Sequence, residues 1–350
     1  MITKNSIQKV LETARIEEVV GDFVNLKKRG TNYVGLCPFH NERTPSFNVN
    51  PVRNIFKCFG CGKGGDAVNF LMEHEQFSYP EALRFIAKRY NIELEETEET
   101  AEAVEEKKLE DSLYIVNQFA KDYFSNTLFN STEGQNIGMS YFKERGFREN
   151  IIQKFDLGYS IESTDALQKE AKAKGYNEEY LIKTGLVKQV DNGIKRDFFR
   201  GRVIFPVHNV SGKVVGFGGR ILKKDEKQPK YLNSPESEVY HKSKILYGIF
   251  HARQSIRTHD ECFLVEGYTD VVSLHQGGIE NVVASSGTSL TVDQIKLIKR
   301  FTNNITILYD GDAAGIKAAL RGLELILEED MNVRIVLLPE PEDPDSYVQK

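Results

Sequence analysis

Four potential metal ligands occur as two closely spaced pairs near the start of the chain, Cys37 with His40 and Cys58 with Cys61. The pairs have the spacings Cys-x2-His and Cys-x2-Cys and are separated by seventeen residues, which is typical of tetrahedral zinc sites. Four protein ligands leave no open position for a substrate. We therefore expect one tightly held structural zinc ion here, and we expect any catalysis elsewhere in the chain.

Acidic residues that follow apolar segments in the last third of the chain form a second set of candidate ligands. Glu266 follows an expected strand at 263–265, and Asp310 and Asp312 follow another at 305–309. Parallel strands end at one edge of their sheet, where open α/β sheets bind ligands. Clustered carboxylates repel one another unless cations neutralise them, and their hard oxygen atoms favour Mg2+ or Mn2+. Further acids expected at this edge are Asp270, Asp343 and Asp345.

Such an edge supports displacement at phosphorus, because paired metal ions stabilise the attacking and leaving oxygen atoms. Each acid also has an ordinary structural interpretation. Asp-Gly-Asp after a strand is often a turn, and a single acid after a strand often caps a helix. Three acid groups at three equivalent strand ends favour the metal site over these alternatives.

Positive charge concentrates in residues 195–257, which contain fourteen Lys or Arg and five acids, a local net charge of +9. Arginines flank the apolar segments in this region, and Arg220 follows directly on two glycines. Glycine permits close backbone approach, so the pattern favours binding of nucleotide or nucleic-acid phosphate. A solvated basic face is the alternative.

The formal net charge of −5 conceals this basic region, because acid and base are segregated along the chain. Residues 93–111 hold ten acids and two lysines, a local net charge of −8, which leaves +3 for the remainder. The first residues lack the pattern of a signal peptide, and no run of eighteen apolar residues occurs. We expect a cytoplasmic protein, and in a reducing compartment clustered cysteines bind metal more often than they form disulfides.

Several local signals predict the elements that position these groups. Segments 46–50 and 55–58 predict a hairpin between the ligand pairs, Asp66 is expected to cap a helix, and Ser78 to begin another that runs toward Tyr90. From about residue 260 strands and helices alternate, which indicates a parallel α/β sheet. We expect a multidomain protein of the α/β and α+β classes, with a zinc-binding domain at 1–94 (ribbon at about 37–61), an acidic linker at 95–111, a mixed α/β basic subdomain at 112–259 and the parallel sheet at 260–350.

Taken together, these segments resemble the bacterial DNA primases, and the resemblance covers essentially the whole chain. The order and combination of the matching motifs are highly specific. Segments 37–40 and 57–62 resemble the zinc ribbon of that family. The segments that resemble its polymerase core are 141–147, 200–206, 216–220 and 230–235, and those that resemble its TOPRIM fold are 265–270, 286–291, 309–315 and 343–345.

The resemblance implies a nucleotidyltransferase, a DNA-directed RNA polymerase that makes short RNA primers on single-stranded DNA during replication. It implies ribonucleoside triphosphates as substrates, an RNA–DNA hybrid as product, one structural Zn2+ and catalytic Mg2+ or Mn2+. Glu266, Asp310 and Asp312 would be the principal catalytic acids, and Asp270, Asp343 and Asp345 would complete a metal-binding rim; proton transfer is the alternative role for Glu266. The residues that would hold template or triphosphate are Arg145, Arg200, Arg202, Arg220, Lys230 and Lys242.

The family context also implies partners and a location. A cytoplasmic enzyme at replication forks would contact the replicative helicase, but the helical and helicase-binding regions that follow the TOPRIM fold in the family are expected to be absent from this chain. No membrane contact is expected. Two other functions fit parts of the pattern: another TOPRIM phosphotransfer enzyme, such as a nuclease or topoisomerase, and a non-catalytic zinc-dependent DNA-binding module.

Overall fold

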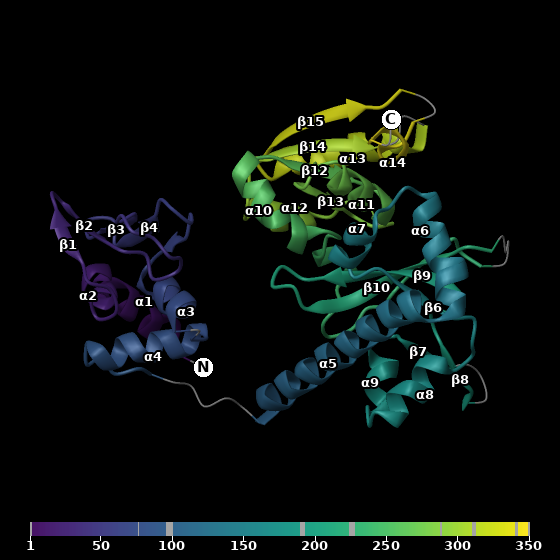
Figure 1. The fold of residues 1–350 in the computed structure, drawn as a ribbon, viewed down its shortest axis with the longest axis horizontal. Helices are drawn as coiled ribbons and strands as arrows, with labels where there is room; N and C mark the ends of the chain where they lie inside the picture. Colours follow the sequence, from purple (N-terminus) through teal and green to yellow (C-terminus); the bar gives the residue numbers. More distant parts are fainter. Residues whose placement is uncertain are drawn as a thin grey trace. The chain divides into compact units, whose positions relative to one another are not determined.

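The computed structural model describes residues 2–75, 77–95, 101–189, 193–223, 228–287, 289–309, 313–339 and 342–348. The chain forms two compact units, Met1–Val104 and Glu105–Lys350, which Figure 1 shows as ribbons. Helix α5 (Ala101–Asn130) begins just before the boundary between them. Residues 101–111 of the expected acidic linker therefore lie in this helix, and residues 96–100 lie outside the described residues.

Unit 1 is an antiparallel sheet with helices before and after it in the chain. The hairpin expected between the ligand pairs is present, with Phe47 opposite Cys58 and Asn50 opposite Ile55. The sheet has the order β1-β2-β3-β4-β5. Its strands are β1 (Lys27–Arg29), β2 (Asn32–Gly35), β3 (Phe47–Asn50), β4 (Ile55–Cys58) and β5 (Gly64–Gly65), and the helices are α1 (Lys4–Thr13), α2 (Ile16–Gly21), α3 (Ala67–His74) and α4 (Tyr79–Arg89).

Caps and an aromatic cluster hold unit 1 together. Asp66 caps α3 by accepting from the amide of Asn69, as the sequence predicts, and Ser78 begins α4 with a capping box. Phe47, Phe56 and Phe70 are at most 2% exposed, and their ring centroids lie 5.2 to 6.1 Å apart. Burial of these rings removes apolar surface from water and fixes β3 and β4, the second of which ends at Cys58.

Unit 2 begins with a helical segment and an antiparallel sheet of order β11-β10-β9-β6. Strands β9 and β10 are buried along most of their length, so this sheet lies in the core. A separate two-stranded sheet pairs β7 with β8. The elements are α5, the π-helix Gly134–Met139, α6 (Ser140–Glu144), α7 (Glu149–Lys154), β6 (Gly158–Ser160), α8 (Ala166–Ala173), α9 (Glu178–Lys183), β7 (Val187–Gln189), β8 (Lys195–Asp197), β9 (Arg202–His208), β10 (Val214–Ile221) and β11 (Tyr231–Asn233).

The remainder of unit 2 is the expected alternation of strands and helices. Its four strands are parallel and have the order β13-β12-β14-β15, so the strands that precede Glu266 and Asp310 are direct neighbours. No described helix is both long and apolar enough to cross a membrane. The elements are the short helix Lys242–Lys244, α10 (Ile249–His259), β12 (Cys262–Val265), α11 (Tyr268–Gln276), β13 (Val282–Ala284), α12 (Val292–Lys299), β14 (Asn304–Tyr309), α13 (Ala313–Glu328), β15 (Asn332–Leu337) and α14 (Pro344–Val348).

Candidate metal and phosphate-binding sites

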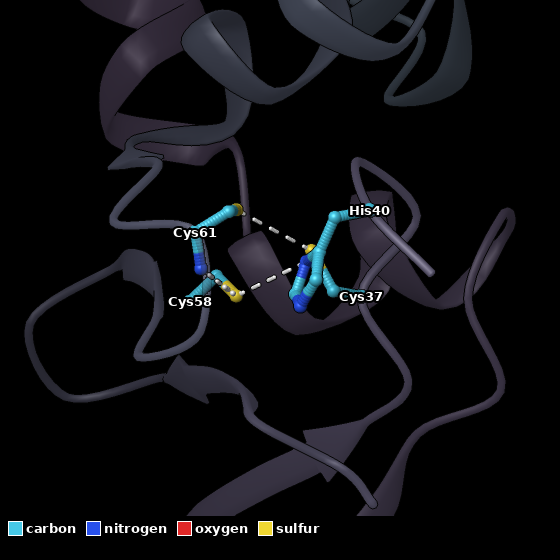
Figure 2. Close-up of side chains that lie close together, drawn as sticks. All are labelled: Cys37, His40, Cys58 and Cys61. Atoms are coloured by element: carbon cyan, nitrogen blue, oxygen red, sulfur yellow. Dashed lines mark hydrogen bonds between the residues drawn. The ribbon is translucent and has the colours of Figure 1, made fainter. Parts of the chain in front are cut away.

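The four predicted zinc ligands converge in unit 1, and Figure 2 shows their side chains directed toward one another. Their ligand atoms all lie within 4.8 Å of one another. The Sγ atoms of Cys37 and Cys61 are 3.8 Å apart, and Cys58 Sγ lies 3.8 Å from His40 Nδ1. With Zn–S bonds of about 2.3 Å, a tetrahedral site separates two sulfur ligands by about 3.8 Å. The spacing and the donor set therefore fit Zn2+.

Backbone amides donate to two of the sulfur atoms, and at Cys58 the surroundings favour the thiolate. The amides of Gly60 and Cys61 donate to Cys58 Sγ at 3.3 and 3.4 Å, and the amide of Phe39 donates to Cys37 Sγ at 3.4 Å. Burial by itself raises the pKa of Cys58, but hydrogen bonds, among them those from the amides of Gly60 and Cys61, outweigh it and lower the pKa. The turn after β4 thus favours a thiolate, which is the form that binds zinc.

A cavity of about 750 Å3 in unit 2 contains the second candidate site. Glu266, directly after β12, and Asp270, in the first turn of α11, both line it. Lys242 lines it as well, so predicted acids and a predicted cation share one cavity. Tyr309, the last residue of β14, forms part of the wall, and Asp310 and Asp312 lie outside the described residues.

The other predicted acids make contacts within the protein. Asp270 Oδ2 accepts from the amide of Gly267 at 2.9 Å, and Asp343 Oδ1 accepts from the amide of Ser346 at 2.7 Å. These are helix-capping contacts, which are the ordinary structural alternative to metal binding for an acid that follows a strand. Asp345 is 5% exposed, pairs with Arg145 and accepts from the hydroxyl of Ser273. Among the described residues that line the cavity, Asp343 and Asp345 do not appear.

The predicted phosphate-binding cations have different surroundings. Lys230 is exposed and Arg200 is partly exposed. Arg220 donates to the hydroxyl of Tyr141, and its guanidinium lies 4.8 Å from the centre of that ring. Arg145 pairs with Asp345, so two predicted site residues neutralise each other.

Arg202 has a structural environment that the sequence does not reveal. It is 1% exposed, and its guanidinium donates to the carbonyl oxygens of Gly219, Pro229 and Lys230 at 3.1 to 3.3 Å and to the side chain of Gln228 at 3.3 Å. Burial lowers its pKa. These contacts hold the segment before β11 against β10 and leave the guanidinium without access to a phosphate, which corrects the prediction for this residue.

Some residues that line the cavity were not predicted as site residues from the sequence. Tyr268 donates from its hydroxyl to Asn233 Oδ1 at 2.5 Å, and Asn233 Nδ2 donates to the carbonyl of Ser286 at 3.1 Å. This chain of contacts joins β11, the start of α11 and the loop after β13 around the cavity. Arg321 of α13 adds a further cation to the lining. Tyr268 and Asn233 both lie in segments that resemble the primase family, but the sequence does not show that they contact each other, because that contact depends on the tertiary fold.

Comparisons with known proteins cover nearly the whole chain. Family profiles match residues 2–102 as the CHC2 zinc finger, 123–253 as the N-terminal domain of the DNA primase catalytic core, and 263–348 as a Toprim-like domain. The DNA primases of Clostridium acetobutylicum and Pseudomonas aeruginosa are 42% and 40% identical over the whole chain. The chain spans 57% and 53% of the lengths of these two relatives.

Solved structures agree with these matches. The zinc-binding and RNA polymerase domains of the Aquifex aeolicus primase are 38% identical, with a TM-score of 0.64, over 98% of this chain and 82% of that one. A DnaG primase catalytic domain bound to single-stranded DNA is 37% identical, with a TM-score of 0.64, over 69% of this chain and 78% of that one. The predicted fold class and family are both confirmed. The matches extend from the metal-ligand quartet to the parallel sheet, and the chain belongs to the bacterial DNA primase family.

Proposed function

We propose that the protein is a primase, an enzyme that joins ribonucleoside triphosphates into short RNA on a single-stranded DNA template. The observation that supports this most directly is the shared cavity, in which Glu266 at the end of a parallel strand lies with Asp270 and Lys242. An acidic edge beside a cation suits the binding of a triphosphate with its metal ions. The similar Aquifex aeolicus structure comprises the zinc-binding and RNA polymerase domains of a primase.

In this proposal the carboxylates hold Mg2+ or Mn2+. Glu266 is the central ligand, with Asp310 and Asp312 as the principal partners and Asp270 beside them. Bound ions would supply positive charge at the attacking and leaving oxygen atoms around phosphorus. Asp343 and Asp345 complete the rim only if they exchange their present contacts with α14, Arg145 and Ser273.

The cations divide by accessibility. Lys242 faces the cavity and would bind a triphosphate there, and the exposed Lys230 and the partly exposed Arg200 would bind the DNA template. The Arg220 guanidinium lies 4.8 and 5.8 Å from the ring centres of Tyr141 and Tyr231. It would present a phosphate-binding group from a fixed position.

Unit 1 would contact the template. A groove of about 580 Å3 on its sheet is lined by amide, basic and aromatic side chains, including Asn48, Lys57 and Phe59. Phe59 is 74% exposed, so its ring is accessible beside the groove. A basic groove with an exposed ring suits single-stranded nucleic acid, because bases stack on the ring and cations contact the backbone. The zinc ion would be structural and present once per chain.

The proposed partners follow from this reaction. They are single-stranded DNA, the four ribonucleoside triphosphates and the RNA–DNA hybrid product, and the family context adds the replicative helicase at a cytoplasmic replication fork. One relative of known structure is described as bound to single-stranded DNA.

A matched pair of variants on strand β12 tests the proposal. Glu266→Gln removes a charge at the carboxyl end of the strand, whereas Glu261→Gln removes one just before it, where Glu261 accepts from Thr306 at 2.7 Å. We expect RNA synthesis on single-stranded DNA, with triphosphates and Mg2+ or Mn2+, to fall at least 100-fold with Glu266→Gln and to persist with Glu261→Gln. In Mn2+ titrations followed by calorimetry, we expect Glu266→Gln to weaken Mn2+ binding and Glu261→Gln to leave it unchanged.

Three results would contradict the proposal. Equal RNA synthesis by both variants would remove Glu266 from the reaction. DNA cleavage or relaxation without triphosphates would instead identify a nuclease or topoisomerase of the same fold. Single-stranded DNA binding with no saturable Mn2+ binding by the unaltered chain would identify a non-catalytic DNA-binding module whose acids cap helices.

A further inference from the structure

Glu42 lies beside the zinc-ligand quartet and contacts the loop that carries its first two members. Its Oε1 atom accepts from the amide of Cys37 at 2.7 Å and from the amide of Ser46 at 3.0 Å. Its Oε2 atom accepts from the Ser46 hydroxyl at 2.5 Å and lies 3.2 Å from His40 Nε2. The side chain of Glu42 is 9% exposed, so these contacts lie largely out of water.

The two nitrogen atoms of the His40 ring face different groups. Nδ1 lies 3.8 Å from Cys58 Sγ, on the side of the sulfur ligands, and Nε2 faces the Glu42 carboxylate. Gly60 closes a third side, because a Cβ atom at that position would lie 2.6 Å from His40 Nε2 and 2.8 Å from Ser46 Oγ. The ring therefore has little freedom to turn over.

We propose that Glu42 is a positioning residue for zinc, a role that rests on the proposed zinc ion in the quartet. Glu42 Oε2 accepts a hydrogen bond from His40 Nε2–H, which fixes the imidazole tautomer and leaves Nδ1 as the atom that binds the metal. Glu42 Oε1 at the same time fixes the backbone at Cys37, the neighbouring ligand. One carboxylate thus orients two of the four ligands.

The physical basis is the influence of a carboxylate on a metal-bound imidazole. A histidine that donates its free N–H to a carboxylate is a more basic ligand with a fixed ring orientation, and loss of such a partner typically reduces metal affinity about 10- to 100-fold. The carboxylate charge is offset locally, because the amide of Cys37 and the amide and hydroxyl of Ser46 all donate to it.

Glu42→Gln is the informative variant in the full 350-residue chain. Its amide oxygen can still accept from the backbone at Cys37 and Ser46, but its NH2 group cannot accept from His40 Nε2–H. Glu12→Gln is the matched control, because it removes one charge from an exposed position on α1, where the described contact is with Gln8. Zinc transfer to a colorimetric chelator measures retention of the metal.

We expect Glu42→Gln to weaken zinc retention about 10- to 100-fold and Glu12→Gln to leave it unchanged. A second measurement on the unaltered chain does not depend on the variant folding: 15N NMR of labelled histidine should show His40 bound through Nδ1, with a proton on Nε2. Zinc binding through Nε2, or equal retention by Glu42→Gln and the control, overturns the inference while the zinc site stands. Zinc-free protein after gentle purification overturns the zinc site and the inference together.

Discussion

Tyr268→Phe is the substitution whose effect can be worked out most directly from the cavity. It removes only the hydroxyl that donates to Asn233 Oδ1 at 2.5 Å and keeps the ring, which is 2% exposed. Asn233 in turn donates to the carbonyl of Ser286 at 3.1 Å, so the change affects the connection between β11 and the loop after β13. Because a buried acceptor that loses its donor costs about 1–3 kcal/mol, and Asn233 is only partly buried, we expect a loss of about 1–2 kcal/mol.

Tyr247→Phe is the matched control for this prediction. Tyr247 is also 2% exposed, its ring centre lies 4.7 Å from that of Tyr268, and its hydroxyl has no hydrogen-bond partner among the described residues. Removing that hydroxyl leaves no acceptor unsatisfied and removes a buried polar group that has no partner, so we expect no loss of stability.

Urea unfolding provides the assay for both tyrosine variants. The chain contains no tryptophan, so circular dichroism is a better probe than fluorescence, and the transition of unit 2 must be separated from that of unit 1. Equal unfolding midpoints for Tyr268→Phe and Tyr247→Phe would refute the reasoning, because the two variants differ chiefly in whether the lost hydroxyl has a partner.

Three further perturbations have defined outcomes. Burial lowers the pKa of His251 to about 3 and that of His275 to about 4, both below the unfolded value of about 6.5, so the folded state disfavours their protonation. Unit 2 should therefore lose stability as the pH falls below about 6.5 toward 4. His275→Phe should reduce the slope of a plot of the urea midpoint against pH. A slope that this substitution leaves unchanged would count against this account. Removal of zinc by a strong chelator should unfold unit 1 and leave the circular dichroism of unit 2 intact, whereas loss of both units together would show that they depend on one another. Arg202→Met should destabilise unit 2 by about 1–3 kcal/mol, because it removes the charged donor that joins the carbonyl oxygens of Gly219, Pro229 and Lys230; a shift below about 0.5 kcal/mol would show that water replaces the guanidinium.

Local patterns predicted much of the fold and the zinc quartet. The spacing of Cys37, His40, Cys58 and Cys61 requires two tight turns joined by a hairpin, and a hairpin brings its ends together in a way that sequence alone can indicate. The alternation of apolar segments after residue 260 predicted the parallel sheet for a similar reason, since a strand and its following helix are adjacent in the chain.

The environments of Arg202, Arg145 and Asp345 could not be predicted from the sequence, because they depend on contacts between segments that are distant in the chain. Arg202 is in a basic region that suggested phosphate binding, but the oxygen atoms that bind it come from residues 17 to 28 positions later in the chain. The pair formed by Arg145 and Asp345 joins residues 200 positions apart. A charge pattern does not distinguish an exposed cation from a buried one, because that depends on which segments the fold places beside it.

The division into two units has a consequence for the order in which the protein matures during synthesis. The four zinc ligands lie between residues 37 and 61, and the core of unit 1 ends near residue 94. The parallel sheet is incomplete until its edge strand β15 has been synthesised, and β12 pairs with β14 more than forty positions later in the chain. A nascent chain on the ribosome can therefore acquire its zinc while the strand that precedes Glu266 is still unmade, and the cavity of unit 2 forms last.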